Sequence, residues 1–521
     1  MDRKKVIRST GVVAGSTFIS RIFGFVRDIL ISSIFGMNDV SDAFYVAFRI
    51  PNLFRRLVAE GALTISFIPV YTDYLHNKTR DESEILARKT VSVLILILFA
   101  VVSLGIIFSP QIVNLFAYGF TDDSLLSLTV LLNRLMFPYL FLVGIVSFCM
   151  GYLNSNKHFF APAFSPVLLN VGIICGAVVF SSFFEQKIMG LAFGVLFGGI
   201  MQLLLQLPYM RRTGYRFSFL PDFKDPGIRR IFRMMTPALL GIAIYQINIL
   251  VNTAFATTIF KGAVSSIYYS DRLTEIVLGI FVVSIANVIL PEMSAKSAKN
   301  DVEGMKSIYA GAAGASLFFA LPASAFLMSC SLPIVSTFFE RNNFTHNDSI
   351  LTSQALFYAA IGLSAVALVR VTMPVFYAVK NTKIPVFTSF ISLVVNAGAG
   401  YLLIKTDLRH AGLTLAVSIA AFAQIFTAFL FMRRKFGKGM LKPVLVSFVK
   451  SFLASVLFGI ILYIIQSKID WSECAFLMKV FWLFVLISTG AVVYLGAAFI
   501  LRIKEIHYLS LFLNKIRRKF L

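Results

Sequence analysis

The stretch Thr90–Phe108, TVSVLILILFAVVSLGIIF, contains 19 residues and no charged side chain. A membrane-spanning helix needs about 20 mostly apolar residues, so this run indicates a transmembrane segment. Thirteen further runs of this kind lie on either side of it, between residues 10 and 501. The sequence therefore predicts an all-α polytopic membrane protein with 14 transmembrane helices.

The composition agrees with this prediction. Of the 521 residues, 58% are apolar and 14% are charged, whereas soluble domains have about 45–50% apolar and about 25% charged residues. The net charge of +23 would suggest a nucleic-acid partner in a soluble protein. Here most of the basic residues lie in short connections between apolar runs, so neither a nucleic-acid partner nor a water-soluble enzyme is expected.

The positions of the basic residues predict the orientation. Both terminal segments and the alternate loops on the same side hold 31 of the 48 Lys and Arg residues, and the loops on the other side hold 6. Loops rich in Lys and Arg face the cytoplasm. Both termini are therefore predicted to be cytoplasmic, which requires an even number of spans.

The two halves of the chain repeat each other at an offset of about 222 residues. The matched positions are Gly190-Leu191, Gln202 and Met210-Arg211-Arg212 with Gly412-Leu413, Gln424 and Met432-Arg433-Arg434, and Asn170-Val171-Gly172 with Asn396-Ala397-Gly398. An offset that contains six spans gives the repeats the same orientation, as in transporters with alternating access. We expect an N-lobe at 1–220, a C-lobe at 221–440, and two extra spans with a basic cytoplasmic tail at 441–521.

Eleven basic residues lie within or at the ends of the predicted spans: Arg21, Arg27, Arg49, Arg55, Arg56, Arg134, Arg233, Arg272, Arg370, Lys450 and Lys479. An Arg at the centre of a span costs roughly 2.5–3.5 kcal/mol on insertion scales, so such a residue must face protein or water. Arg233, Lys450 and Lys479 lie near span ends, where a long side chain can reach the interface. Arg134 can do the same or pair internally.

Few acids in the spans could neutralise these cations: Asp28, Asp42, Glu60, Asp271 and Glu275. Arg49 and Arg56 share a helix face, and Glu60 follows Arg56 by four residues. A surplus of guanidinium groups in a cavity favours an anion, because the planar fork binds phosphate oxygens in pairs. The alternative is an internal lattice of ion pairs between helices.

Several other functional classes lack their motifs. The sequence contains no G-x-x-x-x-G-K-[ST], HExxH or GxSxG pattern, and none of its His or Cys residues has metal-ligand spacing. We expect the five His residues to be solvated in loops and the four Cys residues to be buried thiols. The chain is not expected to be an enzyme or to carry a cofactor, and a coupling ion stays open.

Several blocks resemble the MurJ (MviN) family of lipid II flippases in the MOP exporter superfamily. They are Ser20–Asp28 (SRIFGFVRD), Ser41–Phe44 (SDAF), Pro51–Arg56 (PNLFRR), Glu60–Ala62 (EGA), Tyr268–Leu273 (YYSDRL) and Leu290-Pro291. The length, the predicted spans and the two lobes also agree, so the resemblance covers essentially the whole chain. Arg49 and Arg370 stand where Lys is also expected in the family, and both keep the charge.

The resemblance implies a flippase that carries lipid II, the lipid-linked peptidoglycan precursor, across the bacterial cytoplasmic membrane. Its pyrophosphate would bind Arg21, Arg27, Arg55 and Arg272 in a central cavity. The supporting charged residues would be Asp28, Asp42, Arg49, Arg56, Glu60, Asp271, Glu275 and Arg370. The last two spans would form a groove for the polyprenyl tail, and cell-wall synthesis enzymes are possible partners besides membrane lipids.

Three alternatives stay open on the residues alone. A MATE-type antiporter would show unpaired acids in its cavity, whereas this chain has an excess of Arg. A flippase for another undecaprenyl-linked glycan would use the same arginines, and only the N-terminal block argues against it. A non-transporting scaffold for envelope enzymes would tolerate loss of the cavity arginines.

Overall fold

The computed structural model describes residues 3–57 and 63–507. In this part of the chain every regular element is a helix, which confirms the predicted all-α class. Two compact units can be distinguished, Met1–Ser265 and Ser266–Leu521, and each is described by itself. The expected lobes 1–220 and 221–440 and the extra segment 441–521 stay a prediction.

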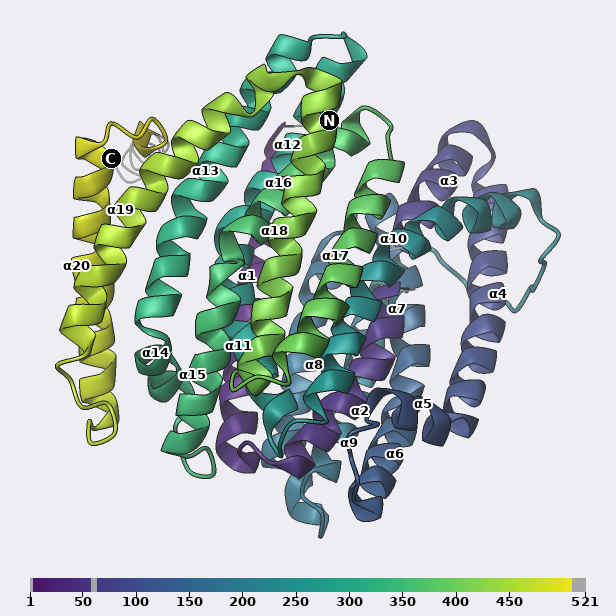
Figure 1. Cartoon of the computed structure of the whole chain (residues 1–521). Coiled ribbons are helices and arrows are strands. Elements are labelled where there is room, and N and C mark those ends of the chain that lie inside the picture. The colour runs from purple at the N-terminus through teal and green to yellow at the C-terminus, as the bar shows by residue number, and fades with distance from the viewer. Residues whose placement is uncertain (1–2, 58–62, 508–521) are drawn as a thin grey trace. The chain divides into compact units, whose positions relative to one another are not determined.

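Within the described residues, the first unit contains ten α-helices (Figure 1). They are α1 (Arg3–Phe35), α2 (Asp39–Arg55), α3 (Leu63–Asn77), α4 (Arg80–Ile107), α5 (Ser109–Phe116), α6 (Asp123–Met136), α7 (Pro138–Ser155), α8 (Phe160–Val178), α9 (Met189–Arg212) and α10 (Pro226–Ala256), with a short 3₁₀ turn η2 (Phe180–Phe183). Local sequence explains several helix starts. Thr79 and Glu82 form a capping box at the start of α4, and Asp225 caps α10 directly before Pro226.

The second unit holds the remaining helices. They are α11 (Ala263–Val277, which begins at the boundary), the π-helical turn η3 (Leu278–Val282), α12 (Val283–Ala298), α13 (Val302–Ser329), α14 (Ser331–Phe339), α15 (His346–Ile361), α16 (Leu363–Ala378), α17 (Lys383–Leu403), α18 (Arg409–Phe436), η4 (Lys438–Met440), α19 (Lys442–Gln466) and α20 (Phe476–Ile500).

Among the described residues, nine helices are long and apolar enough to cross a membrane, and the bent pair α15–α16 makes ten if it is one span. The chain is thus a multi-pass membrane protein. Four of the fourteen predicted spans, at α1, α2–α3, α10 and α11–α12, lie outside this set, and of α10 only Ala243–Ala256 counts there as a shorter apolar helix. That number stays a prediction.

The helices repeat with the same period as the sequence. Both α4 and α13 have 28 residues, and α13 starts 222 residues after α4. In each half this long helix precedes a short one (α5, α14) and then a broken pair (α6–α7, α15–α16). The matched glutamines also make related bonds: Gln202 Nε2 donates to the Ser165 carbonyl oxygen, 3.1 Å, and Gln424 Nε2 to Ser389 Oγ, 3.2 Å.

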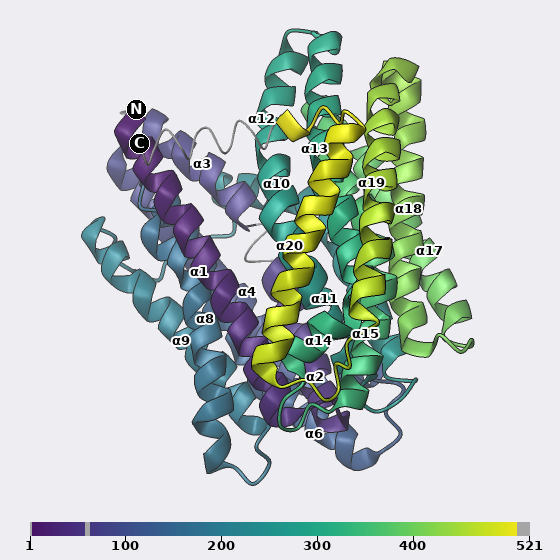
Figure 2. The ribbon, with the colours of Figure 1, turned by 90° about the vertical axis from the view of Figure 1, so that its left-hand side faces the viewer.

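Small residues set the closest helix contacts. A Cβ atom placed on Gly172 of α8 would lie 2.4 Å from the Cα atom of Gly198 in α9, so the two backbones touch there. In the second unit, α19 and α20 lie beside α13 (Figure 2). Ser329 Oγ donates to the Gly459 carbonyl oxygen, 2.8 Å, and Tyr494 Oη to that of Phe318, 2.8 Å. These bonds fasten the two extra helices to the bundle.

Candidate functional site: the charged side chains within the helices

Arg27 on α1 is buried, and each of its three guanidinium nitrogens donates a hydrogen bond. Its Nε and Nη2 atoms donate to Asp28 Oδ1, at 3.0 and 2.7 Å, and its Nη1 atom donates to Asn170 Oδ1 on α8, 3.0 Å. The exposed fraction is 6% for Arg27 and 1% for Asp28. Asn170 also donates from Nδ2 to the Ser20 carbonyl oxygen, 3.0 Å, and so ties α8 to α1. This arrangement holds the guanidinium plane in one orientation.

Asn170 was not among the predicted site residues. The signal was present, because an amide in an otherwise apolar span needs a partner and because Asn170 has a counterpart in the second repeat, Asn396. Arg21 lies six residues before Arg27 and is half-buried. The structure therefore places both α1 arginines within protein rather than at a helix end.

On α2, Asp42 acts as a backbone acceptor. Its carboxylate accepts from the N–H groups of Gly262 and Ser265, 2.7 and 2.8 Å, and from Ser265 Oγ, 2.6 Å. The sequence predicted Asp42 as an ion-pair partner of the arginines. The three hydrogen bonds instead join α2 to the segment that starts α11, and they compensate for the burial of a carboxylate that is 1% exposed.

The other basic residues of α2 are half-buried. Arg49 Nη1 donates to Thr253 Oγ1 on α10, and Arg55 Nε donates to Asn52 Oδ1, 2.7 Å. Arg56 is also half-buried. Its predicted partner Glu60 lies outside the described residues.

In the second unit, Arg272 lies on α11. Its Nη1 atom is 2.8 Å from Glu275 Oε2, its Nη2 atom donates to Tyr268 Oη, 2.8 Å, and its guanidinium carbon lies 4.8 Å from the centre of the Tyr268 ring. Asp271 is exposed, and Arg370 is half-buried on α16. Arg27 and Arg272 each have a carboxylate partner from the protein, and the expectation that most of these arginines lack one stays a prediction. Whether these arginines and Arg21 and Arg55 bind one ligand stays a prediction.

Comparisons with known proteins decide the family. A family model described as lipid II flippase MurJ matches residues 31–482. The chain belongs to the MurJ family. A probable lipid II flippase MurJ of Buchnera aphidicola subsp. Schizaphis graminum is 36% identical over 516 residues, 98% of each chain. That of Haemophilus influenzae is 31% identical over 517 residues, 95% of this chain and 99% of the relative.

Solved structures agree with the MurJ assignment. The structure titled lipid II flippase MurJ, inward closed conformation, is 26% identical, covers 96% of this chain and 99% of its own, and has a TM-score of 0.80. An inward-facing MATE-family transporter of the MOP superfamily is 16% identical and covers 81% of this chain and 95% of its own, with a TM-score of 0.68. The second likeness shows the shared fold alone.

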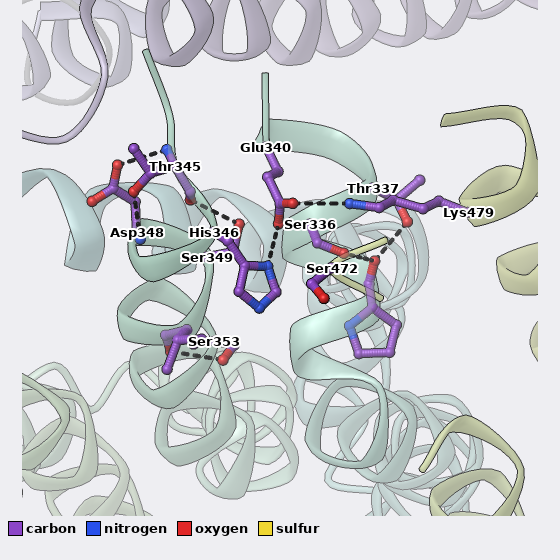
Figure 3. Close-up of polar contacts among 12 residues, drawn as sticks. Ser336, Thr337, Glu340, Thr345, His346, Asp348, Ser349, Ser353, Ser472 and Lys479 are labelled. Carbon is purple, nitrogen blue, oxygen red and sulfur yellow. Dashed lines mark hydrogen bonds and ion pairs between the residues drawn. The ribbon is translucent and has the colours of Figure 1, made fainter. Parts of the chain in front are cut away.

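This MurJ chain also has a charged cluster that the sequence interpretation missed (Figure 3). Lys479 on α20 was expected to reach the interface, but it is 6% exposed and its Nζ atom lies 3.0 Å from Glu340 Oε1. The other oxygen of Glu340 accepts from His346 Nδ1, 3.0 Å. His346 was expected to be solvated in a loop. The cluster instead ties α20 to the connection between α14 and α15.

The prediction of solvated histidines is wrong for His410, which is 2% exposed and donates from Nε2 to the Leu351 carbonyl oxygen, 2.8 Å. It lies near the start of α18, where packing against α15 covers it. A second missed carboxylate is Glu505, 7% exposed, which accepts from Ser447 Oγ at 2.5 Å. Cys149 and Cys330 are buried free thiols, as expected, whereas Cys175 and Cys474 are free thiols that are only half-buried.

Proposed function

We propose that the chain translocates lipid II from the inner to the outer leaflet of the bacterial cytoplasmic membrane. The observation that carries the proposal is the match of nearly the whole chain to relatives named probable lipid II flippase MurJ. The protein lies in the membrane with both termini in the cytoplasm. It acts as a transporter and catalyses no covalent reaction.

The headgroup of lipid II is a pyrophosphate that bears a disaccharide-pentapeptide, and it is too large and polar to cross lipid unaided. Arg21, Arg27 and Arg55 of the first unit and Arg272 of the second bind the pyrophosphate. Guanidinium groups suit this task because their N–H donors match phosphate oxygens in pairs. The lobes then rock by alternating access around the bound headgroup.

The contacts of Arg27 and Arg272 refine this proposal. Each guanidinium already has a carboxylate within 3 Å, Asp28 and Glu275 respectively. The pyrophosphate therefore competes with these carboxylates, and the acids hold the arginines in place when the substrate is absent. Arg49, Arg56, Arg370 and the remaining acids Asp42, Glu60 and Asp271 support the cavity.

An inside-negative membrane potential favours export of the anionic headgroup. Moving each negative charge outward gains about 2.3 kcal/mol per 100 mV. The same field, or an ion gradient, can instead reset the empty protein. The other partners are membrane lipids, a groove beside α19 and α20 for the polyprenyl tail, and cell-wall synthesis enzymes.

Charge removal tests the proposal in cells depleted of their own flippase. Arg27→Ala and Arg272→Ala should abolish lipid II export at a normal membrane level, and Arg434→Ala, an exposed position at the end of α18, should not. Because Arg27→Ala leaves Asp28 buried alone, Arg27→Ala/Asp28→Ala is made in parallel and should fail as well. Normal export by both the double variant and Arg272→Ala would contradict the anion-binding role and favour the scaffold alternative.

A further inference from the structure

The connection between α9 and α10, residues 213–225, leaves large apolar side chains outside the protein. Phe217, Phe219, Leu220 and Phe223 are 58, 52, 43 and 52% exposed. A cytoplasmic loop surrounded by water would gain free energy by burying such side chains, and a contiguous exposed apolar patch marks an interaction surface. We call the connection 213–225, which carries these four side chains, the aromatic loop.

The aromatic loop is held in place by polar bonds to α4. Lys89 Nζ lies 2.9 Å from Asp222 Oδ2 and 2.8 Å from Asp225 Oδ2. The backbone N–H of Leu220 donates to Ser92 Oγ, 2.8 Å. Hydrogen bonds from Lys89 hold the pKa of the Asp222 carboxyl below its ordinary value, so the ion pair between Lys89 and Asp222 stays charged near neutral pH.

The same segment does bury one aromatic ring. Tyr215 packs edge-on against Tyr152 of α7, with ring centres 5.0 Å apart. The loop can therefore turn an aromatic side chain inward. Its phenylalanines point outward while its backbone is fixed, so their exposure belongs to a defined surface.

The positions of Lys89 and Ser92 along α4 place this surface near the inner boundary of the membrane. Ser92 lies 15 residues before Ile107, the outer end of α4, which corresponds to about 23 Å of helix. The hydrocarbon layer is about 30 Å thick. Measured from Ile107 at the outer edge, a backbone bonded to Ser92 thus lies within that layer, about 7 Å from its inner edge, and Figure 1 shows the connection returning alongside α4.

The charges around the aromatic loop are basic. Residues 211–230 contain six Lys and Arg residues and two Asp residues, and Lys89 engages both aspartates. Arg211, Arg216, Lys224 and Arg229 are exposed. Apolar rings next to basic side chains are the composition of a segment that lies in an anionic membrane interface.

We propose that the aromatic loop inserts into the inner leaflet beside α4 and that the basic side chains around it bind anionic phospholipid headgroups. The site anchors the junction of the two repeats to the membrane and selects anionic lipid there. It concerns bulk phospholipid and does not depend on which substrate is transported, so it stands or falls independently of lipid II export.

Spin labels report the depth of the loop in the full-length protein. Phe219→Cys and Phe223→Cys are labelled in a background without the four native cysteines, in nanodiscs of phosphatidylcholine with or without phosphatidylglycerol. The matched control is Lys299→Cys, an exposed position in the turn between α12 and α13. The collision rates with oxygen and with a water-soluble nickel chelate are measured.

We expect labels at 219 and 223 to be accessible to oxygen and shielded from nickel, and the label at 299 to show the reverse. Phosphatidylglycerol should increase the shielding, and Arg216→Gln/Lys224→Gln should remove that increase, since each basic side chain near an anionic surface contributes roughly fivefold to binding. Lys89→Met should release the loop and raise nickel access at 219. Nickel access at 219 and 223 equal to that at 299 would overturn the proposal, because the surface would then face water and a soluble partner.

Discussion

The three nitrogen atoms of the Arg27 guanidinium donate hydrogen bonds to two side chains, Asp28 and Asn170, and these bonds explain how a cation is kept inside an apolar bundle. A buried charge is tolerated only with a counter-ion and with its hydrogen bonds satisfied. Asp42 meets the same requirement with backbone N–H groups instead of a cation. The residue type therefore predicts the need for partners but does not predict which partners are used.

Removal of the Asp28 charge tests this view of Arg27. Asp28→Asn leaves a 6%-exposed guanidinium without its carboxylate, and breaking a buried pair from one side costs on the order of 3–5 kcal/mol. We expect a large fall in the thermal unfolding temperature of the purified protein. Asp271→Asn, at an exposed position on α11, should change it little. Equal unfolding temperatures for the two variants would show that Arg27 is solvated.

Helix packing separates two glycines that the sequence repeat makes equivalent. Gly172 of α8 touches the backbone of α9, whereas a Cβ on Gly398 of α17 would meet no heavy atom within 4 Å. The repeat thus retained the residue but not its packing role. Gly190 and Gly412, by contrast, both lie against the chain that precedes their helix: Gly190 against Ser181 in η2, and Gly412 against Leu403 at the end of α17.

Alanine at these two positions should have opposite effects. Gly172→Ala forces α8 and α9 apart, because the added carbon would lie 2.4 Å from a Cα atom, and overpacking of this kind costs about 1–3 kcal/mol. Gly398→Ala should be neutral or should stabilise by up to about 1 kcal/mol through helix propensity. Thermal unfolding in detergent measures both. A loss of stability at Gly398 that equals the loss at Gly172 would contradict the packing described here.

At the scale of the whole molecule, the sequence predicted the properties that depend on repeated, averaged signals. Apolar runs predicted a helical membrane protein, and the constant offset predicted repeated elements that recur as α4 and α13. It could not predict the Glu340–Lys479 pair, because the two residues are far apart in the chain and meet only when α20 packs beside α14. Sites made by such distant pairs, Arg27 with Asn170 among them, need the tertiary structure.

The orientation of the repeats is the last property that follows from the sequence offset. Thr121 and Asn343 occupy equivalent connections that the sequence predicts to be outer, and Lys78 and Lys299 occupy equivalent turns that it predicts to be cytoplasmic; all four are exposed. Because the offset contains an even number of spans, both members of a pair must face the same side. We expect a membrane-impermeant maleimide to label cysteines at 121 and 343 in intact cells, and those at 78 and 299 only after lysis. Opposite labelling within either pair would mean that the repeats are inverted, and the six-span offset, the cytoplasmic termini and the parallel lobes would then all be wrong.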